Sequence, residues 1–357
     1  MRRLWAAVAD FLDNRLRWKK WSQGAGVSFP GLPIFRFKDA VAFAIEADGQ
    51  IDVFGAALHP RLQSKVKGRL SGQLVPRMVL DDLSKSAHEL QPFSHFRISG
   101  EMQSGRLRDW LKATGCSIVQ SERGTGKVAM ATLFQQGPES VVPWLNHHRE
   151  LGVDHFLLAY NGNPPEELVD ALVDQCDVRL IRWDLPYSFS GSAWDRRDLH
   201  YAQPPFLQWA YRWCELSGFD RVLTCDLDEF ILSDPTEFKE LMRSGHSEVV
   251  FENVWAKTES RDSRVDLKQR VAIAEKAMPR VCRGKSAKRV GVFDSIDVHY
   301  TSKNAVFGGW FLHFAHQTGG VFRPESEFHW TEPMRIEDVR ELLPTLELPM
   351  RSAPSNK

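Results

Sequence analysis

Three carboxylates stand close together after a short apolar stretch, in the segment FDRVLTCDLDEFIL (219–232). They belong to Asp226, Asp228 and Glu229, and the apolar residues just before them, 221–224, are typical of a buried strand. Like charges repel one another, so a strand that ends on crowded carboxylates needs a compensating partner. Residues two apart in an extended chain point to the same side, and we therefore expect Asp226 and Asp228 to face one point.

Two carboxylates that face one point either share a proton or hold a cation. Hard oxygen ligands beside a phosphate site suit Mg²⁺ or Mn²⁺, and such an ion would stabilise the charge that grows on a departing diphosphate. Two other interpretations stay open. The segment is a solvated acidic turn, or Asp226 is the nucleophile of a haloacid-dehalogenase-type phosphohydrolase, although Phe230 then stands where that enzyme class has Thr or Val.

The elements that must position these carboxylates alternate between strand and helix patterns. Strands are predicted by apolar runs at 127–134, 154–161, 178–183 and 221–226. Helices are predicted by periodicity, by early prolines and by terminal glycines at 139–151, 164–175 and 204–218. Such alternation with short connections indicates βαβ units and a mostly parallel sheet, in which ligands bind beyond the carboxyl ends of the strands. Asp226 and Asp228 stand at such an end.

The chain before about residue 125 has a different pattern. Alternating residues around Asp48-Gly49 predict a hairpin, 93–102 predicts a strand, and 104–115 predicts a short helix. We expect residues 1–125 to form a mixed α/β region of unknown role, 126–335 to form the catalytic domain, and 336–357 to form a C-terminal helix and tail. The segment 1–18 predicts an amphipathic helix, which either packs on the protein or contacts a membrane surface.

Composition narrows the classes of function. The 357 residues carry 46 Lys and Arg against 46 Asp and Glu, so the formal net charge is zero and bulk attraction to nucleic acid is not indicated. The five cysteines are scattered without a CxxC pair, which argues against a disulfide framework and a zinc ribbon and favours a reducing compartment. We expect a cytoplasmic protein, with peripheral contact at the inner membrane face as the alternative to a fully soluble one.

Four segments together resemble the family-2-like glycosyltransferases, and within them the subgroup related to family 92, which carries a DxDEF motif. The resemblance covers about residues 127–318 and is carried by WLNHHRELGVDHFLLAYNGN (144–163), VRLIRW (178–183), AQPPFLQWAYRWC (202–214) and FDRVLTCDLDEFIL (219–232). It implies a GT-A fold, which is a Rossmann-like α/β half that binds a nucleotide sugar, followed by a more variable acceptor half. It also implies that Asp226 and Asp228 lie at the metal and diphosphate, and that Glu229 orients the site or binds sugar or acceptor.

The sequence departs from that family at the positions that usually hold the base and ribose. The family has Lys-Asn-Glu after its first strand, where this chain has Gln135, Gln136 and Gly137. It has Glu before the helix Trp, where this chain has Pro143, and after the second strand only Asn161 matches its pattern. Asn161 is thus the expected nucleotide contact, and the donor stays open. A non-catalytic glycan-binding or scaffold protein on the same fold is a further alternative.

Downstream residues complete the expected site by the same resemblance. Lys285, in a basic stretch without interleaved aromatic residues, is expected to contact the diphosphate. His299 is the first and His313 the second expected histidine ligand of the metal. We interpret His147 and His148 as structural, with His148 facing the core. Two carboxylates, those of Glu252 and Asp294, are available as a catalytic base without a motif to favour either, so the stereochemistry stays open.

The sequence therefore predicts a metal-dependent hexosyltransferase of the α/β class with Asp228 and Glu229 as its catalytic carboxylates. The expected cofactor is Mn²⁺ or Mg²⁺, bound by Asp226, Asp228 and a late histidine. The expected partners are a UDP- or GDP-sugar donor and a glycan or glycolipid acceptor, without nucleic acid.

Overall fold

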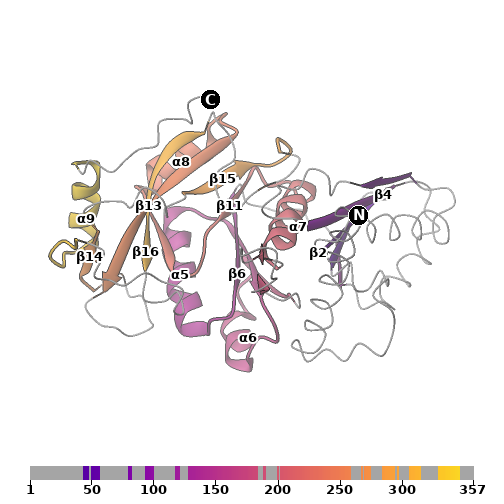
Figure 1. Ribbon diagram of the computed structural model, residues 1–357, viewed down its shortest axis with the longest axis horizontal. Coiled ribbons are helices and arrows are strands. Elements are labelled where there is room, and N and C mark those ends of the chain that lie inside the picture. Colours follow the sequence, from indigo (N-terminus) through magenta and orange to yellow (C-terminus); the bar gives the residue numbers. More distant parts are fainter. Residues whose placement is uncertain are drawn as a thin grey trace, which may run out of the picture.

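Two β-sheets with one helix between them hold most of the described residues in the computed structural model (Figure 1). The structure describes residues 43–47, 50–56, 79–82, 93–99, 117–120, 128–183, 188–189, 199–200, 202–258, 267, 269–274, 284–293, 296, 305–314 and 329–345. Among them the protein is α/β, which confirms the predicted class.

The larger sheet has nine strands, in the order β12-β16-β13-β15-β11-β6-β7-β8, with β14 paired to β13. Its strands are β6 (Val128–Phe134), β7 (His155–Tyr160), β8 (Val178–Arg182), β11 (Arg221–Thr224), β12 (Glu229–Leu232), β13 (Glu248–Thr258), β14 (Val271–Ile273), β15 (Lys285–Arg289) and β16 (Val306–Phe314). The helices of this part are α5 (Pro138–Leu151), α6 (Glu166–Leu172), α7 (Gln203–Leu216), α8 (Pro235–Arg243), α9 (Ile336–Leu342) and the 3-10 turn η5 (Leu343–Thr345).

The parallel half of this sheet is the βαβ series that the sequence predicts. Strands β11, β6, β7 and β8 are parallel neighbours, and α5, α6 and α7 lie between them in the chain. The chain moves outward from β6 to β8 and then returns to the other side of β6 to form β11. Ligands bind at such a reversal of strand order, beyond the carboxyl ends of the two strands that flank it. The carboxyl ends of β6 and β11 are therefore where a site is expected.

The other half of the sheet is mixed. Strand β15 is antiparallel to β11 and to β13, β16 is parallel to β13, and β12 is antiparallel to β16. It follows that β12 runs opposite to β11, although only residues 225–228 separate them. The chain must reverse within those residues, and they carry two of the three carboxylates.

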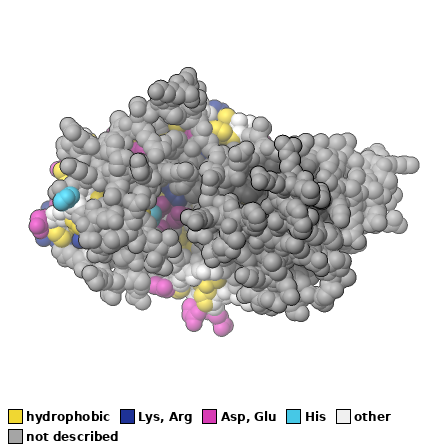
Figure 2. Space-filling model, in the orientation of Figure 1, with side chains coloured by type: hydrophobic (Ala, Val, Ile, Leu, Met, Phe, Trp, Pro, Cys, Tyr) yellow, Lys and Arg dark blue, Asp and Glu magenta, His cyan; other side chains and the backbone are white. Residues whose placement is uncertain are grey.

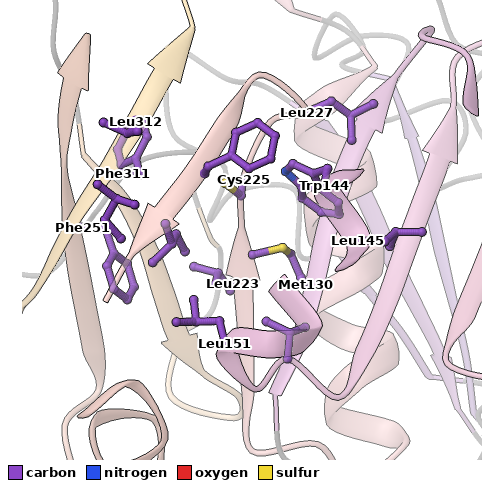
Figure 3. Close-up of a cluster of buried hydrophobic side chains, with 14 of the residues drawn as sticks. Met130, Trp144, Leu145, Leu151, Leu223, Cys225, Leu227, Phe251, Phe311 and Leu312 are labelled. Carbon is purple, nitrogen blue, oxygen red and sulfur yellow. The ribbon is translucent and has the colours of Figure 1, made fainter. Parts of the chain in front are cut away.

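The two faces of the parallel strands bury different helices. Alternate residues of β6, such as Val128 and Met130, pack with apolar residues of α5 and α6, and Figure 3 shows the centre of this cluster, including Trp144 and Leu223. The intervening residues of β6, Ala129, Ala131 and Leu133, pack with α7 on the opposite face. The alternation of side chains along a strand thus gives a buried sheet with helices on both faces.

Helix α7 is buried all round because a second sheet covers its outer side. That sheet has the order β3-β4-β2-β1-β5, and Ile45 and Phe54 from it join Trp209 and Trp213 of α7 in one apolar cluster. Figure 1 shows α7 between this sheet and the parallel strands. The strands are β1 (Phe43–Ala47), β2 (Gln50–Ala56), β3 (Val79–Asp82), β4 (Phe93–Ser99) and β5 (Ser117–Gln120), and the short strands β9 (Ser188–Phe189) and β10 (Leu199–His200) form a separate pair.

The hairpin predicted around Asp48-Gly49 is confirmed by the antiparallel pairing of β1 with β2, and the strand predicted at 93–102 is confirmed by β4. The helices predicted at 1–18 and 104–115 lie outside the described residues. The three-part division of the chain and a contact with a membrane surface stay predictions. No helix among the residues that the structure describes is long and apolar enough to cross a membrane.

Candidate functional site

The acidic segment is a turn, which corrects the extended conformation that we expect from the sequence. Strand β11 ends at Thr224, and the Glu229 N–H donates to the Asp226 carbonyl oxygen over 3.1 Å. The indole N–H of Trp144 donates to the same carbonyl and to that of Glu229, each over 3.0 Å. The chain turns here because β12 runs opposite to β11, and the carboxylates of Asp226 and Asp228 consequently have different partners.

Asp226 faces a lysine. The Lys285 Nζ lies 2.6 Å from Asp226 Oδ2 and 3.2 Å from Glu229 Oε2, and its side chain is only 3% exposed. The Glu229 Oε2 also accepts from the Asp226 backbone N–H over 2.8 Å, and the Gln203 Nε2 lies 3.4 Å from Asp226 Oδ1. Asp226, at 37% exposed, is the member of this group that solvent reaches most readily. One buried ammonium therefore compensates two of the three crowded carboxylates.

Asp228 faces a histidine from a distant strand. The His313 Nε2 lies 3.2 Å from Asp228 Oδ2, and its Nδ1 lies 3.7 Å from Glu229 Oε1. The His313 ring stacks on Trp255 at a centroid distance of 4.1 Å, which fixes the plane of the imidazole. Ligand atoms from Asp228, Glu229 and His313 all lie within 4.8 Å of one another, so these three residues could hold a metal ion.

The charges of the cluster shift the pKa values of its members. Burial raises the pKa of the Glu229 carboxyl to about 7, against the opposing charge of Lys285. Burial alone would lower the pKa of the Lys285 ammonium, but Asp226 and Glu229 outweigh it and the pKa is raised. Burial would likewise lower the pKa of His313, and the Asp228 carboxylate raises it instead. Lys285 thus stays charged at neutral pH.

The structure brings together most of the site residues that the sequence predicts. Asp226, Asp228, Glu229, Lys285 and His313 form one cluster at the carboxyl end of β11. Figure 2 shows side chains of these types, Lys or Arg, Asp or Glu, and His, together in a hollow of the face in view.

One expected residue, Asn161, makes its contacts at the ends of other strands. The amide of Asn161 is buried, receives the Gln135 Nε2 at 3.3 Å and donates to the Trp183 carbonyl over 3.0 Å. These bonds tie together the ends of β6, β7 and β8, and the nucleotide contact of Asn161 stays a prediction. His299, the first expected histidine ligand, lies outside the described residues.

Sequence reasoning missed three residues of the site. Gln203 and Trp255 carry no sequence signal, because their neighbours are distant in the chain. Trp144 has a weak one, since His147 and His148 follow it at helical spacings that place all three on one face of α5.

The sequence matches no protein-family model and no curated protein. Among solved structures, the chain is similar to HddC from Yersinia pseudotuberculosis, with 10% identity and a TM-score of 0.29. That likeness covers 53% of this chain and 93% of HddC, and it is too weak to assign a family.

Proposed function

We propose that this protein is a metal-dependent glycosyltransferase that moves a sugar from a nucleotide-diphosphate donor to a hydroxyl of a glycan or glycolipid acceptor. The observation that carries the proposal is the grouping of Asp228, Glu229 and His313 beside Lys285, beyond the carboxyl ends of β6 and β11. The DLDEF segment that supplies the carboxylates resembles the motif of GT-A glycosyltransferases, and the parallel strands before it are compatible with that fold.

The spacing of two of the three ligand atoms is compatible with a divalent ion. Adjacent ligands of an octahedral ion with bonds of about 2.1 Å lie roughly 3 Å apart, and Asp228 Oδ2 lies 3.2 Å from His313 Nε2. Carboxylates suit Mg²⁺ and Mn²⁺, whereas an imidazole suits the first-row transition metals, so the mixed donor set favours Mn²⁺. When bound, the ion would stabilise negative charge on the diphosphate as it leaves.

The residues of the chain would act on the donor in distinct ways. Lys285 is held between Asp226 and Glu229, so its ammonium is fixed close to the expected metal position and can bind a diphosphate oxygen. Asp226 is the more exposed carboxylate and keeps this lysine in place. Trp255 holds the plane of the His313 ring, which leaves its Nε2 directed at Asp228.

A binding experiment tests the proposal. The thermal midpoint of the protein is measured with UDP and with GDP, each with and without Mn²⁺, since a ligand that binds only the folded state stabilises it. We expect a rise with Mn²⁺ alone, and a larger rise when nucleotide and Mn²⁺ are both present. The variant Asp228→Asn should weaken Mn²⁺ binding by about 100-fold, while Asp220→Asn, at an exposed position just before β11, should leave it unchanged.

Turnover separates the alternatives. A panel of UDP- and GDP-sugars should yield free nucleotide diphosphate in the presence of an acceptor. Hydrolysis of generic phosphate esters without sugar transfer would instead identify a phosphohydrolase with Asp226 as nucleophile. Absence of any nucleotide binding that depends on Mn²⁺ would contradict the proposal and favour a non-catalytic glycan-binding protein.

A further inference from the structure

The strand that carries Glu229 lies at an edge of the nine-stranded sheet. Among the residues that the structure describes, β12 pairs with β16 alone, and the Phe314 N–H donates to the Asp228 carbonyl at the end of that ladder. Glu229–His313 and Ile231–Phe311 are therefore the non-hydrogen-bonded pairs of an antiparallel ladder. Their side chains lie closest together, and the backbone groups of Glu229 and Ile231 point away from β16.

Helix α5 satisfies those outward backbone groups. The Trp144 indole N–H donates to the Glu229 carbonyl over 3.0 Å, and the His147 Nε2 donates to the Ile231 carbonyl over 2.8 Å. The Ile231 N–H donates to the His148 Nε2 over 3.4 Å. Side chains from one face of a helix thus occupy the hydrogen-bonding positions that a neighbouring strand would fill.

The two imidazoles are held in opposite tautomers by their partners. His147 must carry a proton on Nε2, because a carbonyl oxygen only accepts. His148 donates from Nδ1 to the Trp144 carbonyl over 2.9 Å, so its Nε2 is free to accept only in the neutral ring. Both rings also pack against Phe230, at centroid distances of 5.4 and 6.0 Å. The orientation of each ring is therefore fixed twice, by a hydrogen bond and by aromatic packing.

We propose that Trp144, His147 and His148 are positioning residues that replace a neighbouring strand for β12 and hold Asp228 and Glu229 in register with His313. The inference rests on the proposed function, because it assigns the cluster so positioned to a metal ion.

Register matters here more than stability alone. Strand β12 has four residues, and a slip by one residue would move the Glu229 side chain to the opposite face of the sheet. It would also end the contacts of Glu229 with Lys285 and His313. Three hydrogen bonds from α5 oppose such a slip on the side of β12 that β16 does not occupy.

Amide hydrogen exchange of β12 tests the positioning without any metal. The variants are Trp144→Phe and His147→Leu, each of which removes a donor to the strand. The matched control is Trp209→Phe in α7, because that indole is also fully buried and its N–H has no hydrogen-bond partner in the described structure. In both test variants we expect the amides of residues 229–232 to exchange at least about tenfold faster, while those of β6 keep their rates. In the control, the ratio of the rates of β12 and β6 should stay as in the wild type. Equal acceleration of β6 and β12, or no acceleration, would overturn the inference.

Affinity for Mn²⁺, measured by calorimetry, gives a readout that a purely structural role would not move. Trp144→Phe and His147→Leu should each raise the Kd by about tenfold, whereas Trp209→Phe should change it by less than about twofold. His147→Gln retains a donor and should restore most of the affinity. Wild-type affinity in both test variants would overturn the inference. If the wild-type protein binds no Mn²⁺, the proposed function fails, and the exchange experiment alone then decides whether α5 positions β12.

Discussion

Charge compensation at the level of single residues explains how three carboxylates can end one strand. Lys285 is almost fully buried between Asp226 and Glu229, and His313 lies against Asp228. Without a metal, Lys285 and a protonated His313 would offset two of the three negative charges. With a divalent ion bound, His313 would be neutral, and Lys285 and the ion together would offset all three. An acidic cluster without such partners would repel itself and would tend to take up protons instead.

Removal of the lysine should therefore destabilise the fold. Lys285→Met leaves the buried Glu229 without its ammonium, and loss of one partner of a buried pair costs about 3 kcal/mol. Loss of the pairing with Asp226 adds little to this cost, because that carboxylate is 37% exposed and water can solvate it. Urea unfolding at neutral pH measures the loss, and Lys239→Met, on the exposed side of α8, is the control. A loss no larger than that of the control would contradict this role of Lys285.

The two aspartates should differ as metal ligands. Asp228 belongs to the group with Glu229 and His313, whereas both oxygens of Asp226 face polar groups of Lys285 and Gln203. We expect Asp228→Asn to weaken Mn²⁺ binding by at least about tenfold more than Asp226→Asn does. Calorimetry on the two variants decides the ranking, and equal losses would show that both carboxylates bind the ion directly.

At the scale of elements, a bulge sets the register that brings His313 to the acidic turn. The pairing of β13 with β16 shifts between Val250 and Phe251, where β16 carries Gly308 and Gly309. Gly309 has a φ of +123°, and a Cβ there would lie 3.1 Å from the Leu232 carbonyl oxygen of β12. Only glycine tolerates that backbone conformation beside a neighbouring strand.

Gly309→Ala should consequently strain the contact between β16 and β12. Forcing a side chain into this backbone region costs about 2 kcal/mol, and relief of the strain would displace His313 from Asp228. The loss in stability is measured by urea unfolding and the displacement by Mn²⁺ affinity. Gly245→Ala is the control, because a Cβ there has no atom within 4 Å and its φ is not positive. Unchanged affinity in Gly309→Ala would show that the register does not depend on this glycine.

The contact of α5 with β12 should also make stability depend on pH. Burial lowers the pKa of His147 and lowers that of His148 well below the ordinary 6.5, with Arg340 acting in the same direction on His147 and Glu150 against it. The unfolded chain then binds protons more readily than the folded one. The stability that these two rings contribute is fully present above pH 6.5. It is lost as the pH falls from 6.5 toward the folded pKa values, by about 1.4 kcal/mol per pH unit for each neutral ring.

Urea unfolding between pH 7.5 and 5 measures this slope. The variant His148→Gln removes one titrating group and should show a shallower slope below pH 6.5, whereas His246→Gln, at an exposed position, should retain that of the wild type. Identical slopes in all three proteins would mean that other groups set the acid sensitivity.

At the scale of the whole molecule, the N-terminal sheet completes the burial of α7. Asp52 of β2 is fully buried and accepts from the Arg212 Nε over 2.9 Å, and Arg212 also pairs with Glu215. The same helix begins with Gln203, which faces Asp226. One element thus contacts both the second sheet and the acidic cluster.

Asp52→Ala should cost far more stability than the same change at a partly exposed pair. The Asp52 side chain is 1% exposed. Its loss leaves the mostly buried Arg212 guanidinium with Glu215 as its remaining acidic partner, and it should lower the free energy of unfolding by about 3 kcal/mol. Asp177 pairs with Arg149 at 2.6 Å, but both side chains are more than a quarter exposed, and Asp177→Ala should cost about 1 kcal/mol or less. Urea unfolding of both variants compares the two, and equal costs would contradict the role of Asp52 in joining the sheets.

The sequence alone determined the parallel half of the protein. Strands β6, β7, β8 and β11 and the helices between them follow from apolar periodicity and from prolines and glycines at helix ends, which act within a few residues. Local pattern also placed Asp226 and Asp228 at a strand end. It did not predict β13, whose buried polar residues Glu248 and Asn253 interrupt its apolar pattern.

Only the tertiary structure decided which side chains meet those carboxylates. Lys285 lies 59 residues from Asp226 in the chain, and His313 lies 85 residues from Asp228. Their approach depends on the registers of β12, β13, β15 and β16, which are fixed by long-range pairing and by a bulge. The pairing of β12 with β16 also makes β12 run opposite to β11, so residues 225–228 form a turn and not the extended segment that we expected. A short segment of sequence does not encode the direction of a strand whose partners are distant in the chain.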